Sequence, residues 1–364
     1  MSKILVQICC SVDSHYFLES LRGDYPDDEI VGFFYNPNIH PFSEYMLRYK
    51  DVEFSCKLLG ITLLDGLYDI DKWYEITKGY ENEPEKGERC SVCFDDRLEV
   101  TALKAREIGC DSFTTTLLMS PLKSQEKLHN IGLQIGERYN LGFIYKDYRS
   151  GQGGINQSKA VKDNRLYRQN YCGCMYALNA QRVSQNKLNI ELMSPISQQI
   201  LPNSIEERLE LFALRDEYHS KNIEFFIKKV EFLNYRLLQA WVSKNKTIIP
   251  SYFLPFSYLK SQNSKGKIEF IKNGIGYLSK NGIMLITIEK FNLLANKDYK
   301  NTAYLMKNPL LFEEEISLRR ILTKESNSLS PIVIVDCMEL DDSIEIRLNS
   351  TYFIDTKEQL ETIS

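Results

Sequence analysis

Short apolar runs alternate with longer segments of helical periodicity along the first half of the chain. Between the apolar runs, hydrophobic residues recur every three to four positions, at about residues 14–21, 44–59, 93–108 and 124–139. The runs themselves have the length of buried strands and occupy residues 3–8, 29–35, 61–66, 112–116 and 142–146. This alternation predicts an α/β fold with a mostly parallel sheet.

The pattern changes after about residue 190. Ser204 and Glu207 have the spacing of a capping box, and helical spacing then continues to about Trp241. Short strand patterns follow, and Asn273-Gly274 and Asn281-Gly282 are typical two-residue hairpin turns. The predicted strands occupy residues 267–272, 275–278, 283–288, 331–335 and 344–348.

These patterns predict two domains. The first spans residues 1–180, and the second is a C-terminal α+β extension with a β-meander that spans residues 190–364. The boundary falls at about residues 180–200, where no glycine- or serine-rich linker marks it.

Composition narrows the class of protein. The 364 residues are 43% hydrophobic and 26% charged, which is typical of an ordered soluble protein. No apolar run approaches the ~20 residues of a membrane span, so we expect a cytoplasmic protein without membrane contact. The net charge of −4 means that any nucleic acid must be bound through a local basic patch.

Nine cysteines are the most informative part of the composition, and eight of them precede residue 180. In a reducing compartment, free thiols serve as metal ligands or redox groups. The adjacent pair Cys9-Cys10 and the pair Cys90-x-x-Cys93 together supply the four thiolates of an iron–sulfur cluster or of a structural zinc site. Taken singly, each pair is equally consistent with small buried hydrophobic residues.

Two other features each have two possible interpretations. Cys172 and Cys174 are so close in the chain that they close only a strained, redox-labile disulfide, or they are two unpaired loop thiols. Asp13 follows Cys10 by three residues and either binds a cation or caps the first helix. Cys56 and Cys110 have no spaced partners and are expected in the core.

A basic stretch precedes Cys172. Basic residues recur there every three positions, roughly along one helix face, and tyrosines that could stack on bases accompany them. We predict that this stretch binds tRNA, although a solvated basic helix has the same pattern. The residues are Lys159, Lys162, Arg165 and Arg168 with Tyr167 and Tyr171.

Four segments, in this order and spacing, resemble the QueH type of epoxyqueuosine reductase over about residues 1–178. The segments are Cys9-Cys10-Ser11-Val12-Asp13, Phe34-Tyr35-Asn36-Pro37-Asn38-Ile39-His40-Pro41, Arg89-Cys90-Ser91-Val92-Cys93-Phe94 and Tyr167-Arg168-Gln169-Asn170-Tyr171-Cys172-Gly173-Cys174. The resemblance implies a Rossmann-like sheet of the nucleotide-alpha-hydrolase type. It also implies the last step of queuosine synthesis, the two-electron removal of the epoxide oxygen of epoxyqueuosine at the wobble position of tRNA.

The resemblance also implies cofactors and roles. A [4Fe-4S] cluster would be bound by Cys9, Cys10, Cys90 and Cys93. An adjacent iron or other divalent metal would use Asp13 and shared thiolates, and Cys172 and Cys174 would form a redox-active disulfide. The partners would be tRNA carrying epoxyqueuosine and an electron donor that the sequence does not specify.

The chain departs from the family pattern at two places. Gln7 and Ser11-Val12 stand where the family usually has a histidine and Ala-Pro, so the imidazole that could donate a proton is absent. Tyr35, His40 and Tyr45 are other protic side chains near the second strand, each with an equally good structural role. The segment after about residue 180 is an addition to the core family.

Two other functions remain to be tested. An ATP-dependent tRNA-modifying enzyme of the PP-loop type needs a glycine-rich loop after the first strand, but residues 9–14 contain no glycine. A zinc-stabilised RNA-binding protein without redox activity is the non-enzymatic alternative.

Overall fold

The chain folds into two compact units. The computed structural model describes residues 2–121, 123–193, 199–278, 282–325 and 328–363. Unit 1 comprises residues 1–192 and 209–224, and unit 2 comprises residues 193–208 and 225–364. Residues 209–224, which the sequence pattern assigned to the second domain, therefore belong to unit 1.

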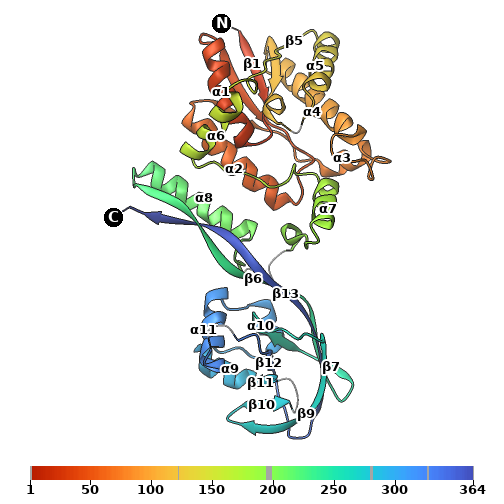
Figure 1. Cartoon of the computed structure of the whole chain (residues 1–364), viewed down its shortest axis with the longest axis vertical. Helices are drawn as coiled ribbons and strands as arrows, with labels where there is room; N and C mark the ends of the chain where they lie inside the picture. Colours follow the sequence, from red (N-terminus) through yellow and green to blue (C-terminus); the bar gives the residue numbers. More distant parts are fainter. Residues whose placement is uncertain (1, 122, 194–198, 279–281, 326–327, 364) are drawn as a thin grey trace. The chain divides into compact units, whose positions relative to one another are not determined.

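Unit 1 is an α/β unit built on a five-stranded parallel sheet with the order β3-β2-β1-β4-β5 (Figure 1). The strands are β1 (Lys3–Gln7), β2 (Glu29–Phe34), β3 (Thr62–Asp65), β4 (Ser112–Thr115) and β5 (Gly142–Phe143). All five predicted strands are present. The order reverses between β1 and β4, and at such a switch point the strand ends leave a crevice where α/β proteins bind ligands.

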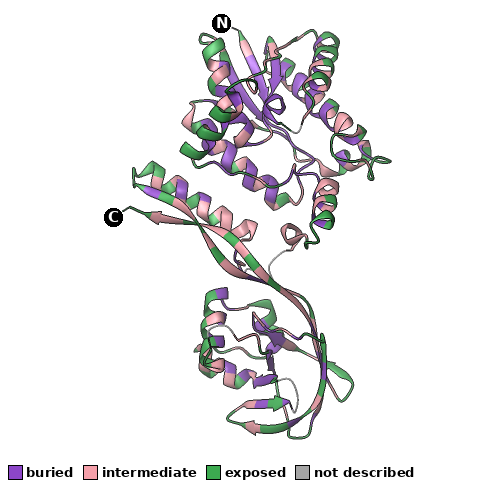
Figure 2. Cartoon of the chain, viewed as in Figure 1, coloured by how far each residue is buried: buried purple, intermediate pink, exposed green. Residues whose placement is uncertain are grey.

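Helices cover both faces of this sheet. Figure 1 shows α1, α2 and α6 on one face and α4 and α5 on the other. The helices are α1 (Ser11–Asp24), α2 (Phe42–Leu58), α3 (Ile70–Ile76), α4 (Glu88–Glu107), α5 (Gln125–Tyr139), α6 (Gly153–Asp163), α7 (Met175–Ser184) and α8 (Ile205–Ser220), with short 3-10 turns η1 (Thr116–Met119) and η2 (Ile190–Leu192). The central strands are buried on both faces, as the purple ribbons of Figure 2 show. This burial explains why β1 and β2 read as nearly continuous apolar runs.

Unit 2 contains an eight-stranded mixed sheet with the order β7-β6-β13-β9-β10-β11-β12-β8. Its strands are β6 (Phe225–Lys244), β7 (Thr247–Ile249), β8 (Ser251–Phe253), β9 (Asn263–Lys272), β10 (Ile275–Leu278), β11 (Met284–Thr287), β12 (Ile332–Val335) and β13 (Ser343–Thr362). Its remaining helices are α9 (Ile288–Ala295), α10 (Thr302–Lys307) and α11 (Phe312–Thr323). The expected meander is present as the antiparallel series β9-β10-β11.

The prediction of a helix that continues to about Trp241 is wrong beyond Ser220, where α8 ends. Asn222 has a left-handed backbone at φ 54, and α8 ends just before it. Residues 225–244 form β6, which pairs antiparallel with β13 over its whole length. This stretch is rich in aromatic and β-branched residues, which favour a strand, but its residues are buried only in part, so the expected helical spacing was misleading.

The first predicted hairpin turn is confirmed. Asn273 and Gly274 join β9 to β10 and have φ values of 51 and 76, as a type I′ turn requires. Strands β10 and β11 are also antiparallel neighbours, but Asn281 lies outside the described residues.

Candidate metal and redox site

One cavity of unit 1 collects the six cysteines that the sequence singled out. It has a volume of about 270 Å³ and lies beyond the carboxyl ends of β1 and β4, where the strand order reverses. The cysteines come from the segment after β1, from α4 and from the segment before α7, and they are Cys9, Cys10, Cys90, Cys93, Cys172 and Cys174. Residues that are up to 165 positions apart in the chain thus face one space.

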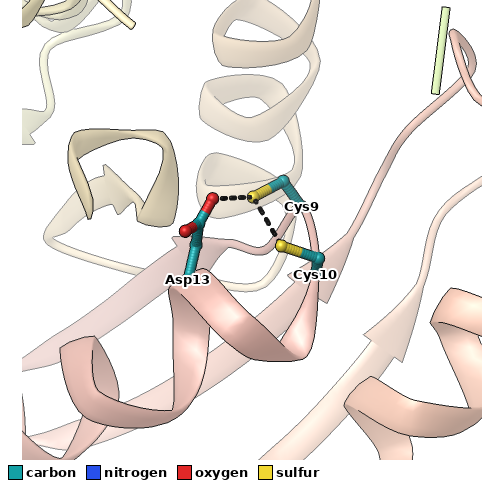
Figure 3. Close-up of side chains that lie close together, drawn as sticks. All are labelled: Cys9, Cys10 and Asp13. Carbon is teal, nitrogen blue, oxygen red and sulfur yellow. Dashed lines mark hydrogen bonds between the residues drawn. The ribbon is translucent and has the colours of Figure 1, made fainter. Parts of the chain in front are cut away.

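Cys9, Cys10 and Asp13 form the tightest part of this site. Their ligand atoms lie within 4.8 Å of one another. The Sγ atoms of Cys9 and Cys10 are 3.6 Å apart, and Oδ2 of Asp13 is 3.5 Å from Sγ of Cys9, as Figure 3 shows. Asp13 accepts no capping bond at the start of α1 and instead points to the thiols. The structure therefore favours the cation-binding reading of Asp13 over the capping one.

Neighbouring segments hold this trio in place. The amide of Cys9 donates to Oγ1 of Thr116 at 3.2 Å, which ties the end of β1 to the end of β4. The side-chain amide of Gln157, on α6, donates to Oδ1 of Asp13 at 2.9 Å and to the carbonyl of Val12 at 3.2 Å. The carboxylate orientation is thus set by a second helix.

The charges of the trio conflict with one another. Because Cys9 shares a hydrogen bond with Cys10, and because Arg97 is nearby, the pKa of Cys9 is lowered to about 5 despite burial. The pKa of Cys10 is raised by the same hydrogen bond and by burial. Burial and the charge on Cys9 raise the pKa of Asp13 well above its usual value. Since these groups cannot all ionise together in a buried space, a bound cation would relieve the conflict.

Cys90 and Cys93 lie in the first turns of α4. The helix begins at Glu88, five residues earlier than the sequence predicted, so both cysteines of the C-x-x-C pair are helical. The amide of Lys86 donates to Sγ of Cys90 at 3.3 Å. Burial raises the pKa of both thiols, so it disfavours the thiolate forms. Coordination of a metal would stabilise the thiolates.

The Cys172-Gly173-Cys174 segment closes the cavity. Arg48 donates to the carbonyls of Cys172 and Tyr171 at 3.1 and 3.0 Å, and its Nε donates to Glu44 at 2.7 Å. All nine cysteines lie among the described residues and are free thiols, so no disulfide links Cys172 to Cys174 here. Cys56 and Cys110 are buried, as expected.

Positive charge surrounds the sulfur atoms, and sequence reasoning assigned no role to the residues that supply it. Arg97 lines the cavity from α4 and donates to Oδ1 of Asn36 at 2.5 Å. Lys123 also lines it, with a side chain that is 9% exposed and 3.5 Å from Glu85. Burial alone would lower the pKa of Lys123, but the charges of Cys172 and Cys90 raise it above its usual value. The cavity is therefore suited to an anionic group.

The residues present fit a metal–thiolate centre. Six thiols and the carboxylates of Asp13 and Glu85 line the cavity, and thiolates are the ligands that iron–sulfur clusters and zinc prefer. The buried polar atoms at its wall that have no hydrogen-bond partner in the described part of the chain include Oδ1 of Asn38, Nε of Arg97 and Oε1 of Gln169. Buried polar atoms usually have partners, so these three indicate a polar occupant.

The protic side chains named from sequence do not line this cavity. Gln7 is fully buried and donates to the carbonyl of Tyr35, while it accepts from Thr115. The hydroxyl of Tyr45 donates to Asp65, and that of Tyr35 donates to Asp96. His40 also lies outside the lining. The structure thus gives the two tyrosines and Gln7 structural roles.

The basic stretch is only partly helical. Lys159 and Lys162 are on α6, which ends at Asp163, and Arg165 has a left-handed backbone at φ 54. The four basic side chains are exposed, whereas Tyr167 and Tyr171 are 8% and 7% exposed. Tyr171 donates to the carbonyl of His40 and packs against Arg48. The tyrosines therefore belong to the packing of unit 1, and the surface carries the cations alone.

A buried ion pair, Asp51 with Arg215, holds two of the segments that line the cavity. Asp51 on α2 accepts from Ser11, the residue after Cys10, and from the amide of Tyr167. Arg215 on α8 donates to Asp51 at 2.5 Å, and both side chains are fully buried. The guanidinium lies between Phe54 and Phe212, 3.9 and 4.5 Å from the ring centres. Helix α8 thus neutralises the carboxylate that holds two cavity segments.

Comparison with known proteins places these features in a family. The family model described as "QueH: Epoxyqueuosine reductase QueH" matches residues 4–180. A Helicobacter pylori protein named epoxyqueuosine reductase QueH is 40% identical over 97% of this chain and 97% of its own length. A Thermotoga maritima protein of the same name is 39% identical over 50% of this chain and 93% of its own length.

Among solved structures, a predicted subunit of tRNA methyltransferase from Methanocaldococcus jannaschii is similar at 14% identity. It covers 44% of this chain and 75% of its own, with a TM-score of 0.33. In the described part of this chain, no helix is both long enough and apolar enough to cross a membrane.

Proposed function

The chain belongs to the epoxyqueuosine reductase QueH family, and from this membership we propose that it reduces epoxyqueuosine to queuosine in tRNA. The reaction breaks both C–O bonds of the epoxide and forms a carbon–carbon double bond. Two electrons and two protons convert the oxygen to water. The observation that carries the proposal is the convergence of six cysteines from separate segments on one cavity.

Cys9, Cys10, Cys90 and Cys93 are the proposed ligands of a [4Fe-4S] cluster. When bound, this group would supply electrons one at a time. Arg97 and Lys123 would stabilise its negative charge, because both are buried beside the thiols. Their placement supports the assignment of an anionic cluster rather than a bare cation.

Asp13 is the proposed ligand of a metal adjacent to the cluster, an iron or another divalent ion. Its carboxylate lies 3.5 Å from the thiol of Cys9 and is oriented by Gln157. A cation at this place would compensate the buried charges and could polarise the epoxide C–O bond. Binding of such a cation would explain why the buried carboxylate of Asp13 faces the thiols.

Cys172 and Cys174 are the proposed redox-active pair, alternating between the free thiols described above and a disulfide. Their segment is fixed to α2 by Arg48, so both sulfurs stay at the cavity wall. A disulfide between cysteines two residues apart is strained and readily reduced, which suits a group that turns over. The donor that supplies their electrons remains to be identified.

The tRNA is proposed to contact the exposed cations before Cys172, which are Lys159, Lys162, Arg165 and Arg168. Tyr167 and Tyr171 are buried, so the bases of the tRNA must stack on other residues. Phosphate contacts of this kind make affinity fall steeply with salt. A titration of tRNA binding against salt should therefore flatten when these four residues are replaced by glutamine.

The test begins with protein purified without oxygen. About four sulfides and more than four irons per chain, together with conversion of epoxyqueuosine in tRNA followed by mass spectrometry, would support the proposal. A colourless protein that holds one zinc and reduces nothing would instead support the RNA-binding alternative. ATP-dependent modification is disfavoured, since residues 9–14 have no glycine to approach a phosphate.

Asp13→Ala tests the adjacent metal. We expect activity to fall by ~10–100-fold or more, because the second metal loses its carboxylate ligand, whereas cluster absorbance is retained. Asp24→Ala at the exposed end of the same helix is the control and should change neither. Loss of the cluster itself in Asp13→Ala would show that the residue is structural.

A further inference from the structure

Unit 2 has a cavity of its own, with a volume of about 280 Å³. Three phenylalanines from different elements line it: Phe232 on β6, Phe256 in the segment after β8, and Phe312 at the start of α11. The ring centres of Phe256 and Phe312 are 6.3 Å apart. Aromatic walls of this kind bind flat apolar groups.

Positive charge dominates the same cavity. Arg319 is 4% exposed, and among the described residues its guanidinium donates to main-chain carbonyls alone, those of Pro255, Ser328 and Ser330. Arg320, at the cavity's exposed side, forms no ion pair with any described residue. Buried charges are normally compensated by an opposite charge, so Arg319 indicates that an anion completes the site.

The other charged residues that line the cavity do not provide a counter-charge for Arg319. The charge of Lys357 is already compensated by Glu207 at 2.6 Å. Glu313 is exposed at the edge. Arg319 and Arg320 are the two lining cations without an ion pair to a described residue, against the one lining carboxylate of Glu313, so the cavity matches a negatively charged ligand.

Phe256 has a backbone conformation that a bulky residue rarely adopts. Its φ is 64, in the left-handed region where glycine or asparagine is usual. Its ring packs 5.3 Å from that of Tyr235, whose hydroxyl donates to the carbonyl of Ser257. Conformational strain of this kind is often retained at binding sites, and here it positions an aromatic ring at the cavity.

We propose that this cavity binds one unpaired nucleotide of the substrate tRNA, with the base against the phenylalanine rings and the phosphate on Arg319 and Arg320. The proposal rests on the proposed function, because it takes tRNA as the ligand. Base–aromatic stacking joined to a cationic backbone contact is the common mode of single-stranded nucleic acid binding.

The relatives favour tRNA over a free nucleotide as the source. The Thermotoga maritima protein is matched over 93% of its length by half of this chain, so its name does not depend on a counterpart of unit 2. The Helicobacter pylori protein is similar to this chain over 97% of both lengths, which includes unit 2. The proposed substrate of the cysteine-bearing half is tRNA, so a unit joined to it in the same chain is suited to binding another part of that tRNA.

The test uses the full chain and two matched pairs of variants. Arg320→Gln is compared with Arg347→Gln, which removes the same charge on β13 outside the cavity. Phe232→Leu is compared with Phe226→Leu, an exposed phenylalanine on the same strand. The measurements are the dissociation constant of labelled tRNA carrying epoxyqueuosine, its salt dependence, and KM and kcat of reduction.

We expect Arg320→Gln and Phe232→Leu to raise the dissociation constant and KM by ~5-fold or more without changing kcat. Arg320→Gln should also reduce the slope of log affinity against log salt by about 1. The two control variants should match the wild type. Thermal unfolding of each variant excludes a folding defect as the cause.

Equal affinities in all five proteins would overturn the inference. So would competition by AMP, GMP, CMP or UMP at micromolar concentration without any effect of the variants on tRNA binding, since that result would identify a site for free nucleotides. A wild type that binds tRNA without reducing it would contradict the proposed function, but the comparison of affinities would still be valid.

Discussion

Gly173 separates Cys172 from Cys174 and has φ 108, a backbone conformation that side chains rarely permit. A Cβ added there would lie 2.8 Å from Cγ1 of Ile39, and the carbonyl of Gly173 accepts from the amide of His40. The glycine thus allows the pair Cys172 and Cys174 to approach the segment that follows β2. The motif Cys-Gly-Cys is therefore a geometric requirement as well as a pattern of thiols.

Gly173→Ala should lower reductase activity by ~10-fold or more, because the segment that carries both cysteines must move. Gly79→Ala is the matched control, since Gly79 has φ 91 but open space around it. It should keep its activity despite similar backbone strain. Steady-state assays of both variants check the prediction, and equal activities would show that the close approach to Ile39 is unimportant.

Glu315 in unit 2 predicts a pH dependence of stability. Burial raises its pKa from 4.5 to about 8, and it accepts a hydrogen bond from Tyr252 at 2.6 Å. A raised pKa means that the folded state binds the proton more tightly than the unfolded one. The stabilisation is therefore complete below about pH 4.5 and is lost as the pH rises through 8.

Glu315→Gln should flatten this dependence, because the amide carries no charge to bury. Urea unfolding of the full chain at pH 5, 7 and 9 checks the prediction through the transition of unit 2. The variant should gain stability relative to the wild type as the pH rises, by ~1.4 kcal/mol for each pH unit over the affected range. A constant difference at all three pH values would contradict it.

At the scale of elements, local patterns were sufficient for the parallel sheet of unit 1. Strands β1 to β5 and helices α1, α2 and α5 lie close to their predicted positions, because apolar periodicity directly reports burial in a parallel sheet. The predicted helix beyond Ser220 is wrong because β6 owes its conformation to β13. Strand β6 is buried only in part along its length, so no continuous apolar run marks it as a strand.

The turn between β9 and β10 allows a prediction about an element. Gly274 has φ 76, and an added Cβ would lie 2.7 Å from Cβ of Lys290 and 2.9 Å from Oγ1 of Thr287. Gly282 has φ 60 with nothing within 4 Å. Gly282→Ala should therefore cost ~1–2 kcal/mol of unfolding free energy from backbone strain, and Gly274→Ala should cost more.

Urea denaturation followed by circular dichroism measures both costs. If the two substitutions destabilise unit 2 equally, the packing of Gly274 against α9 makes no contribution.

At the scale of the whole molecule, unit 1 draws one helix from beyond residue 192. The chain leaves unit 1 and returns to it for residues 209–224, so that Arg215 neutralises the buried carboxylate of Asp51. Removing one partner of a buried ion pair leaves an uncompensated charge. Unit 1 of this protein is therefore incomplete without part of the extension.

Two truncated chains test this dependence. A chain ending at residue 224 retains Arg215 and should unfold at nearly the same temperature as unit 1 in the full chain. A chain ending at residue 192 should be less stable by ~3–5 kcal/mol. Asp51→Asn should restore part of the loss in the shorter chain, since it removes the uncompensated charge. Equal melting of the two truncated chains would show that α8 is dispensable.

The sequence by itself determined the parallel α/β order of unit 1, the cysteine groups and the family, because these depend on local periodicity and on motif spacing. Only the tertiary structure decided which groups share the cavity. It placed Arg97 and Lys123 beside the thiols, buried Tyr167 and Tyr171, and aligned β6 with β13. Contacts between distant segments depend on how the whole chain buries its apolar surface, and this information is absent from any single stretch of sequence.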